Sequence, residues 1–463
     1  MKALDQFLSG RELLKEEIPT NLHGQLAELV AIGEVETYVG FSKVNGQLQC
    51  VRCGASGRKN RYPTPCQCRD NCFYCIACLQ MGKIKACSPI YWLPEKEITF
   101  AKIGERRQER LLAWEGQLSD QQQVASRDIV EAIQTNRTHL VWAVAGAGKT
   151  EMLFEGMEAA LLEGKRICVA SPRIDVCLEL APRFQAAFPN VEVIVLYGEM
   201  DEPYKKTSIV VSTTHQLLRF RQAFDVLVID EVDAFPFKGD ETLMFGAQKS
   251  RKETSALIYL SATPDRKMQK EVKLKKLSAS ILPARYHQNT LPVPVNIWVG
   301  NWKKDTLKKP RQAKVIRIMK DWIQKGRRFL VFVPNIEWME KFEQVCKKMF
   351  PEIPFAAVSS KDVNRKEKVM SMRREEYQFL LSTTILERGV TFPNVHVLVL
   401  GAENQTFTEA ALVQISGRVG RSPLYPTGDV LFLHYGKTSA MKKAIKQIHQ
   451  MNRLAKEKGY IKE

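Results

Sequence analysis

Residues 143–150, Ala-Val-Ala-Gly-Ala-Gly-Lys-Thr, have the composition of a phosphate-binding loop. They end an apolar run, Leu140 to Val144, and precede an amphipathic segment, Glu151 to Glu163, which predicts the order strand, loop and helix. Small residues let backbone N–H groups approach a phosphate at a helix start. Lys149 would then reach the β- and γ-phosphates, and the Thr150 hydroxyl would bind Mg²⁺. The alternative is a chance Gly-Lys-Thr. The predicted nucleotide-binding residues of this loop are Ala143, Val144, Ala145, Gly146, Ala147, Gly148, Lys149 and Thr150.

Carboxylates follow a second apolar run, Phe224 to Ile229, as the sequence Asp230-Glu231-Val232-Asp233. At the end of a buried strand, one acidic residue can hold Mg²⁺ while its neighbour orients the attacking water. We therefore expect Asp230 on the metal side and Glu231 as the catalytic carboxylate. A solvated acidic turn is the alternative. Ser261-Ala262-Thr263 ends the next β-rich run, and its hydroxyls could link the acidic site to nucleic acid.

The chain around these residues alternates short β-rich runs with helical segments. This order is typical of a parallel sheet with helices on both faces. The first set of runs is 166–170, 191–196, 208–211, 224–229 and 256–260, and the second is 328–333, 354–359, 378–381, 395–400 and 428–433. The second set has no phosphate loop of its own. The predicted architecture is therefore α/β with two tandem lobes.

Ligands of such sheets bind at the carboxyl ends of the strands. Ser171-Pro172-Arg173 and Ser212-Thr213-Thr214 stand at two of these ends, where hydroxyls, free amides and an arginine suit the phosphates of a single strand. Residues 383–391 follow a strand of the second lobe in the same way. The predicted DNA-binding residues are Pro172, Arg173, Thr213, Thr214 and Thr383.

Two arginines close the stretch 414–421 of the second lobe. We expect Arg418 and Arg421, three residues apart, to lie on one helical face and to point at a γ-phosphate held by the first lobe. There they would stabilise transition-state charge as arginine fingers. A basic surface helix is the alternative. The predicted catalytic residues are Lys149, Asp230, Glu231, Arg418 and Arg421.

The eleven cysteines are unevenly distributed, with eight between Cys50 and Cys87. In a cytosolic chain such a cluster indicates metal binding. Cys50 with Cys53 and Cys75 with Cys78 form two C-x₂-C pairs, and four thiolates suit a closed tetrahedral Zn²⁺ site. Cys72 with Cys75 has the same spacing, so the register of the second pair stays open. Four cysteines are left over, which allows a second zinc; an iron–sulfur cluster fits the spacing less well.

The composition bounds the class of protein. A chain of 463 residues predicts two or three domains, and a net charge of +18 suggests a polyanionic partner, nucleic acid or an anionic membrane surface. No apolar stretch is long enough for a transmembrane helix, and the first fifteen residues lack a secretory h-region, so a cytoplasmic location is the default. The predicted parts are an N-terminal extension (1–45), a cysteine-rich zinc-binding domain (46–90), and lobes at 105–285 and 290–463, the latter with a basic C-terminal tail.

Residues 118–430 resemble the core of superfamily 2 helicases, because the stretches above fall in the order of the helicase motifs. Leu118-Ser119-Asp120-Gln121-Gln122 resembles the Q motif, which implies that Gln122 contacts adenine, although a capped helix explains the stretch equally well. The resemblance also implies a nucleotide contact at Gly389 and two RecA-like lobes. Gly389 and Thr391 would transmit the state of the ATP site to the bound DNA strand.

A cysteine cluster ahead of such a core resembles the ComFA family, the competence ATPases of naturally transformable Gram-positive bacteria. The resemblance implies an ATP- and Mg²⁺-dependent motor that pulls transforming single-stranded DNA into the cytoplasm. It implies work at the inner membrane face beside the uptake channel ComEC, with the competence proteins ComFC and DprA as partners. Two alternatives are a replication-restart or recombination helicase resembling PriA, and an ATP-gated DNA-binding adaptor that does not translocate.

Overall fold

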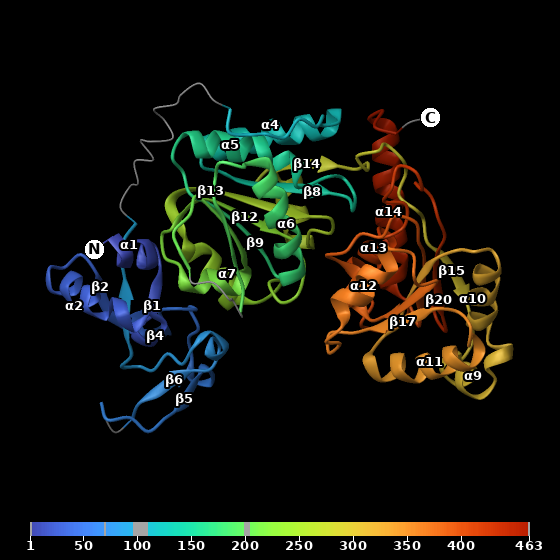
Figure 1. The fold of residues 1–463 in the computed structure, drawn as a ribbon, viewed down its shortest axis with the longest axis horizontal. Coiled ribbons are helices and arrows are strands. Elements are labelled where there is room, and N and C mark those ends of the chain that lie inside the picture. The colour runs from blue at the N-terminus through green and yellow to red at the C-terminus, as the bar shows by residue number, and fades with distance from the viewer. Residues whose placement is uncertain (1, 69–70, 96–109, 199–203, 462–463) are drawn as a thin grey trace. The chain divides into compact units, whose positions relative to one another are not determined.

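The computed structural model describes residues 2–68, 71–95, 110–198 and 204–461 (Figure 1). The described residues form two compact units. The first is made of Met1–Leu118, Gln123–Val141 and Thr150–Ser280, and the second of Ser119–Gln122, Trp142–Lys149 and Ile281–Glu463. The residues of the phosphate loop up to Lys149 are thus counted with the second unit by their contacts.

The first unit is built around a seven-stranded sheet with the order β10-β11-β9-β12-β13-β8-β14. Its strands are β8 (Thr138–Ala143), β9 (Ile167–Ser171), β10 (Val193–Leu196), β11 (Ile209–Thr213), β12 (Phe224–Asp230), β13 (Arg251–Ser261) and β14 (Ser278–Leu282). The pairs from β10 through β13 are parallel. The predicted β-rich runs of this lobe are confirmed, whereas β14 carries no strong apolar run and was not predicted. Because β12 is buried along most of its length, it needs apolar residues on both faces.

The second unit contains a six-stranded, fully parallel sheet with the order β15-β20-β19-β16-β18-β17. Its strands are β15 (Val295–Trp298), β16 (Phe329–Phe332), β17 (Phe355–Val358), β18 (Phe379–Ser382), β19 (His396–Leu400) and β20 (Val430–His434). The five predicted runs of this lobe are confirmed. The edge strand β15 was not predicted, because it has only four residues, one of them is polar and none of them is buried.

Helices cover the faces of both sheets (Figure 1). Those of the first lobe are α4 (Asp120–Gln134), η5 (Glu151–Leu153), α5 (Phe154–Leu162), α6 (Ile174–Ala187), η6 (Thr214–Arg219), α7 (Glu241–Ser250) and α8 (Arg266–Lys273). Those of the second are α9 (Trp302–Lys308), η7 (Pro310–Gln312), α10 (Lys314–Gln324), α11 (Ile336–Met349), α12 (Arg365–Arg373), η8 (Thr384–Glu387), α13 (Glu409–Ser416) and α14 (Ser439–Glu457). The C-terminal helix α14 buries one stripe, including Met441, Ile448 and Met451, so the basic tail packs on its own lobe.

The N-terminal residues form small elements that pack on the first lobe. They are α1 (Lys2–Leu8), α2 (His23–Ala31), the antiparallel sheet of β1 (Glu12–Leu14), β7 (Pro89–Trp92) and β2 (Glu36–Val39), and the hairpins β3 (Phe41–Val44) with β4 (Gln47–Cys50) and β5 (Arg61–Pro63) with β6 (Phe73–Cys75). Short 3₁₀ turns are η1 (Lys15–Glu17), η2 (Thr20–Leu22), η3 (Arg58–Asn60) and η4 (Leu79–Met81). Core residues of these elements and of the first lobe belong to one continuous apolar cluster.

Two local expectations need correction. The charged run Glu105 to Trp114 is typical of a helix, and from the sequence we expect one there. Residues 110–114 are not helical, however, and 105–109 lie outside the described residues. Leu112 and Ala113 instead donate their backbone N–H groups to Glu158 and to the Ala187 carbonyl, so this segment is fixed along α5 and α6. The second correction concerns Arg418 and Arg421. Both follow the end of α13 at Ser416, so they do not share a helical face.

Candidate ATP site and zinc centre

The phosphate loop has the backbone shape that its glycines predict. Gly146 and Gly148 have φ of +83° and +74°, a left-handed conformation that side chains disfavour. The loop is held by the end of β14 and the segment that follows it, because Val144 N–H donates to the Leu282 carbonyl and Tyr286 N–H donates to the Gly146 carbonyl, each at 3.1 Å. The loop therefore has the open, glycine-lined backbone that a nucleotide phosphate requires.

Gln122 joins the start of α4 to the phosphate loop. Its Oε1 accepts hydrogen bonds from the Ser119 N–H and hydroxyl, both at 2.9 Å, as in one half of a capping box. Its Nε2 donates to the Gly148 carbonyl at 3.1 Å. The capped-helix alternative is therefore present in the structure, and the same side chain also contacts the loop. The predicted contact with adenine stays a prediction.

The acidic stretch lies at the end of β12. Asp230 and Glu231 are buried, and Asp230 Oδ1 accepts the Glu231 N–H at 2.8 Å. Glu231 has φ of +55°, a left-handed conformation that costs about 1–3 kcal/mol and is typical of functional positions. Asp233 accepts hydrogen bonds from the hydroxyls of Ser261, at 2.6 Å, and Thr263. The structure therefore connects the acidic stretch directly to the end of β13.

The predicted DNA-binding residues of the first lobe lie together. β9 and β11 are parallel neighbours in which Ser171 pairs with Thr213, so Pro172 and Arg173 leave the sheet at the same edge as Thr213. The Thr214 side chain is fully buried, and its hydroxyl has no partner among the described residues. Only its backbone is therefore suited to a strand at the surface. Thr383, in the second unit, stands between β18 and η8.

The arginines after α13 are held by backbone carbonyls. Arg418 is buried and donates from Nε and Nη2 to the Glu387 carbonyl, at 3.0 and 2.6 Å. Arg421 donates to the Gly417 carbonyl at 3.0 Å and to the Thr391 hydroxyl at 3.1 Å. A Cβ on Gly417 would lie 2.5 Å from the Ala145 side chain, so only glycine permits this approach to the phosphate loop. Gly389, in the loop from Glu387 to Thr391 that both arginines contact, has φ of +72°.

Arg285 was missed by the sequence reasoning. It is fully buried, and its Cγ, Cδ and Nε lie 3.7–3.8 Å from the position that a Cβ on Gly146 would take. Its Nη1 donates to the Gly420 carbonyl, whereas Nε and Nη2 have no hydrogen-bond partner among the described residues. Burial, reinforced by the charge of Arg421, lowers the pKa of Arg285 to about 9. No motif contains this arginine, so no sequence pattern marks it.

The cysteines of the two predicted pairs converge on one point. The Sγ atoms of Cys50, Cys53, Cys75 and Cys78 lie within 4.8 Å of one another and are buried. Cys50 and Cys78 are 3.8 Å apart, and Cys53 and Cys75 are 3.6 Å apart. A Zn–S bond of about 2.3 Å gives a tetrahedron with edges of about 3.8 Å, so the four thiols fit Zn²⁺. The grouping also favours Cys75 with Cys78 over Cys72 with Cys75. Hydrogen bonds from Cys50 and Cys53 lower the pKa of the Cys75 thiol.

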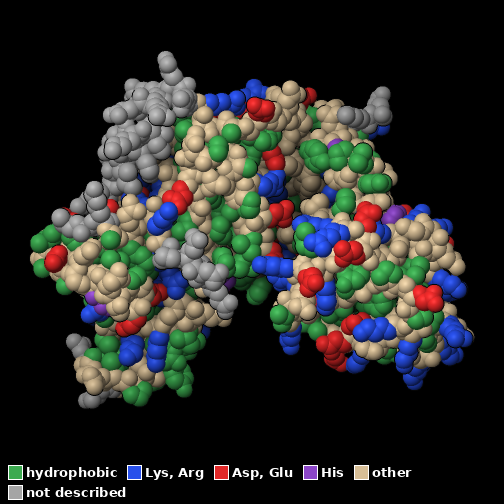
Figure 2. Space-filling view, in the orientation of Figure 1, with side chains coloured by type: hydrophobic (Ala, Val, Ile, Leu, Met, Phe, Trp, Pro, Cys, Tyr) green, Lys and Arg blue, Asp and Glu red, His purple; other side chains and the backbone are tan. Residues whose placement is uncertain are grey.

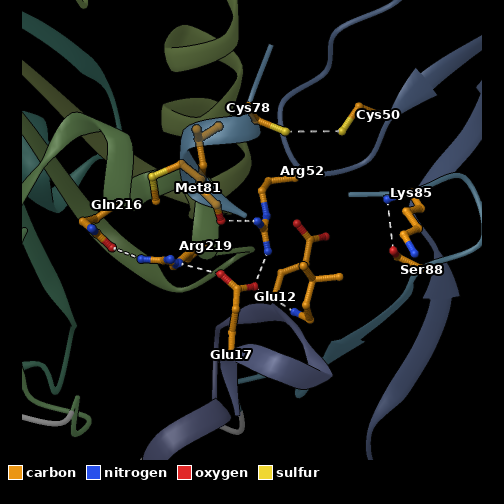
Figure 3. Close-up of polar contacts among 12 residues, drawn as sticks. Glu12, Glu17, Cys50, Arg52, Cys78, Met81, Lys85, Ser88, Gln216 and Arg219 are labelled. Carbon is orange, nitrogen blue, oxygen red and sulfur yellow. Dashed lines mark hydrogen bonds and ion pairs between the residues drawn. The ribbon is translucent and has the colours of Figure 1, made fainter. Parts of the chain in front are cut away.

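Arg52, inside the first cysteine pair, ties this centre to the first lobe (Figure 3). Its buried guanidinium donates to the Met81 carbonyl at 2.5 Å and forms an ion pair with Glu17. Glu17 also pairs with Arg219 at 2.9 Å, and Arg219 donates to Gln216 at 2.9 Å. Gln216 and Arg219 belong to η6, which begins at Thr214. This chain of contacts therefore leads from the zinc centre to the turn that begins at a predicted DNA-binding residue.

Replacing Arg52 with methionine should destabilise this junction. The change removes the Arg52–Glu17 ion pair and leaves the Met81 carbonyl without this donor, while Glu17 keeps its pair with Arg219. A hydrogen bond to a charged group contributes about 1.5–3 kcal/mol, so we expect a loss of stability of this order. The measurement is the urea midpoint of the first unit, with Arg58→Met as an exposed control from the neighbouring turn η3. Equal midpoints for the two variants would contradict the role given to Arg52.

Solved helicases share the two-lobed fold. The structure of S. cerevisiae Dbp5 bound to RNA and ADP BeF3 matches with a TM-score of 0.52 at 14% identity, covering 72% of this chain and 91% of that one. RecG bound to a three-way DNA junction matches with a TM-score of 0.52 at 16% identity, covering 74% and 47%. Family models for the type III restriction enzyme res subunit and the helicase conserved C-terminal domain match residues 115–266 and 311–423. The fold and the motifs define a superfamily 2 helicase-like ATPase.

The N-terminal part gives the particular family. Residues 1–92 match the family model of the competence protein ComFA N-terminal domain. Competence protein ComFA of Bacillus subtilis (strain 168) is 42% identical, covering 98% of this chain and 96% of that protein. Competence protein ComFA of Streptococcus pneumoniae is 39% identical, covering 98% of each. The chain belongs to the ComFA family, and it is a competence-associated, ATP-hydrolysing enzyme. Among the described residues, no helix is long and apolar enough to cross a membrane.

Proposed function

We propose that this protein is an ATP-dependent single-stranded DNA translocase that drives transforming DNA into the cytoplasm during natural competence. The observation that carries the proposal is the pair of hydrogen bonds from Ser261 and Thr263 to Asp233. It gives the acidic stretch of the ATPase a direct connection to the end of β13, in the sheet that also carries the predicted DNA-binding residues of the first lobe. A movement of the acidic stretch during ATP hydrolysis can therefore be transmitted to the bound DNA strand.

Each residue of the ATPase has a role in this proposal. The loop 143–150 binds the phosphates through its backbone and Lys149, and Gln122 positions the loop. Thr150 and Asp230 hold Mg²⁺, whose charge offsets that of the phosphates. Glu231 orients the attacking water. Arg418 and Arg421 stabilise the transition-state charge, and Gly389 with Thr391 passes the change to the strand held by Pro172, Arg173, Thr213, Thr214 and Thr383.

The surface charge of the second unit supports a nucleic-acid partner. Lysine and arginine side chains are spread over α9, α10 and α11 in the view of Figure 2. Exposed examples are Lys303, Lys304, Lys308, Lys309, Lys314, Arg317 and Lys320. Such a field attracts DNA phosphates and releases counterions, so binding should weaken as salt rises. The same charge suits peripheral contact with an anionic membrane face, where ComEC would supply the strand and ComFC and DprA would act as further partners.

The cysteine-rich residues 46–90 form a structural zinc domain in this proposal. Cys50, Cys53, Cys75 and Cys78 hold one Zn²⁺, which leaves no open coordination position and so supplies stability rather than chemistry. Residues 1–45 extend this domain, and the catalytic lobes occupy 105–285 and 290–463. Through Arg52 and Glu17 the zinc centre fixes the position of η6.

The ATPase rate without nucleic acid, with single-stranded DNA and with forked duplex tests the proposal. We expect stimulation by single strands, because the strand-end hydroxyls transmit binding to Asp233, and we expect duplex to add nothing. Lys149→Ala is the inactive control. Greater stimulation by forked duplex would favour a restart helicase resembling PriA, and single-strand binding without any turnover would favour the ATP-gated adaptor.

A further inference from the structure

A second group of four cysteines lies apart from the first. The Sγ atoms of Cys66, Cys68, Cys72 and Cys87 lie within 4.8 Å of one another. Cys66 and Cys87 are 3.5 Å apart, and Cys72 and Cys87 are 3.7 Å apart. These separations are far longer than the ~2.05 Å of a disulfide and close to the ~3.8 Å edge of a zinc–thiolate tetrahedron. The four thiols are therefore arranged as metal ligands rather than as a disulfide pair.

The two groups differ in their surroundings. The four cysteines of the first group are buried and belong to the apolar core that continues into the first lobe. In the second group Cys68 is exposed, Cys66 and Cys87 are half-buried, and none of the four is part of that core. The second group joins the connection between β5 and β6 to the segment that enters β7. Strand β6 itself is linked to that segment by backbone hydrogen bonds from Ala86 N–H to the Phe73 carbonyl and from Cys75 N–H to the Ile84 carbonyl.

We propose that Cys66, Cys68, Cys72 and Cys87 bind a second Zn²⁺, independent of the first. Four soft thiolates leave no open position, so this zinc is structural. It fastens the β5–β6 connection to the segment before β7. Cys72 is buried, but Cys68 is exposed and Cys66 and Cys87 are half-buried, so this zinc exchanges with chelators faster than the one held by four buried thiols.

Zinc content per chain tests this inference in the full-length protein. We expect two equivalents in the unaltered protein, one in Cys87→Ser, and two in Cys346→Ala, a control from the second unit. A competing chelator should release zinc in two phases, with the zinc of the second group released in the early phase. Cys87→Ser should lack this early phase. Circular dichroism checks that Cys87→Ser is folded. In Cys87→Ser we expect protease to cut the β5–β6 connection. The unaltered protein should become equally sensitive once the chelator has removed the zinc of the second group.

Three results would overturn the inference. One is a single equivalent in the unaltered protein that Cys87→Ser retains. Another is two equivalents in Cys87→Ser. The last is a thiol titration of the denatured, chelated protein that gives two thiols fewer than the eleven of the sequence, which would indicate a disulfide in this group.

Discussion

Replacing Glu231 with glutamine is expected to lower the rate of ATP hydrolysis with single-stranded DNA by about 10²–10⁴-fold, the usual contribution of a positioned carboxylate. Glutamine keeps the shape of the side chain, and the Asp230 carboxylate still accepts the backbone N–H at residue 231, so the left-handed backbone survives. What is lost is the negative charge that orients the attacking water. The measurement is steady-state phosphate release at saturating ATP.

Two further measurements make this result specific. Binding of a fluorescent ATP analogue should be retained in Glu231→Gln, because the phosphate loop is untouched. Glu253→Gln, an exposed glutamate on β13, should hydrolyse ATP at the normal rate. A loss of less than fivefold in Glu231→Gln would remove Glu231 from the catalytic role and leave Asp230 or Asp233 to be tested in its place.

Replacing Cys75 with serine is expected to have the largest effect on stability. Structural zinc in small domains contributes about 10–16 kcal/mol of apparent binding free energy, which is as large as the whole stability of a typical domain. The four buried cysteines share their core with Leu217, Phe220 and Leu257 of the first lobe, so the damage should extend into that lobe. We expect loss of zinc, lower soluble yield and rapid proteolysis of residues 1–92.

Cys68→Ser is the matched comparison for that experiment. Cys68 is exposed and lies outside the shared core, so its loss should leave the first lobe folded even though it removes a ligand from the second group. Slow extraction of the buried zinc from the unaltered protein should reproduce the Cys75→Ser behaviour. A Cys75→Ser protein that melts at the same temperature as the unaltered one would contradict a structural zinc centre at this position.

Much of the fold could be predicted because its cues are local. A buried parallel strand needs a continuous apolar run, and such runs marked both sheets except for β14 and β15. The glycines at 146 and 148 likewise predict the left-handed backbone of the phosphate loop. The helix predicted up to Trp114 was wrong, because a charged run is equally compatible with an extended segment held by tertiary hydrogen bonds.

The parts that escaped prediction depend on contacts between residues distant in sequence. Spacing alone leaves the partner of Cys75 open, and only the fold brings it next to Cys50, Cys53 and Cys78. Arg52 lies in a charged, surface-like sequence but is buried through its pair with Glu17. Arg285 has no motif around it, and its position beside Gly146 follows from how the chain returns after β14.

Displacement of streptavidin from the end of a biotinylated single strand tests translocation most directly. The account predicts ATP-dependent displacement from one of the two ends by the unaltered protein. It predicts none with AMP-PNP and none by Glu231→Gln, which should still bind the strand. ATP hydrolysis stimulated by single strands but without displacement from either end would contradict a translocase and would leave an enzyme that turns over ATP without moving along DNA.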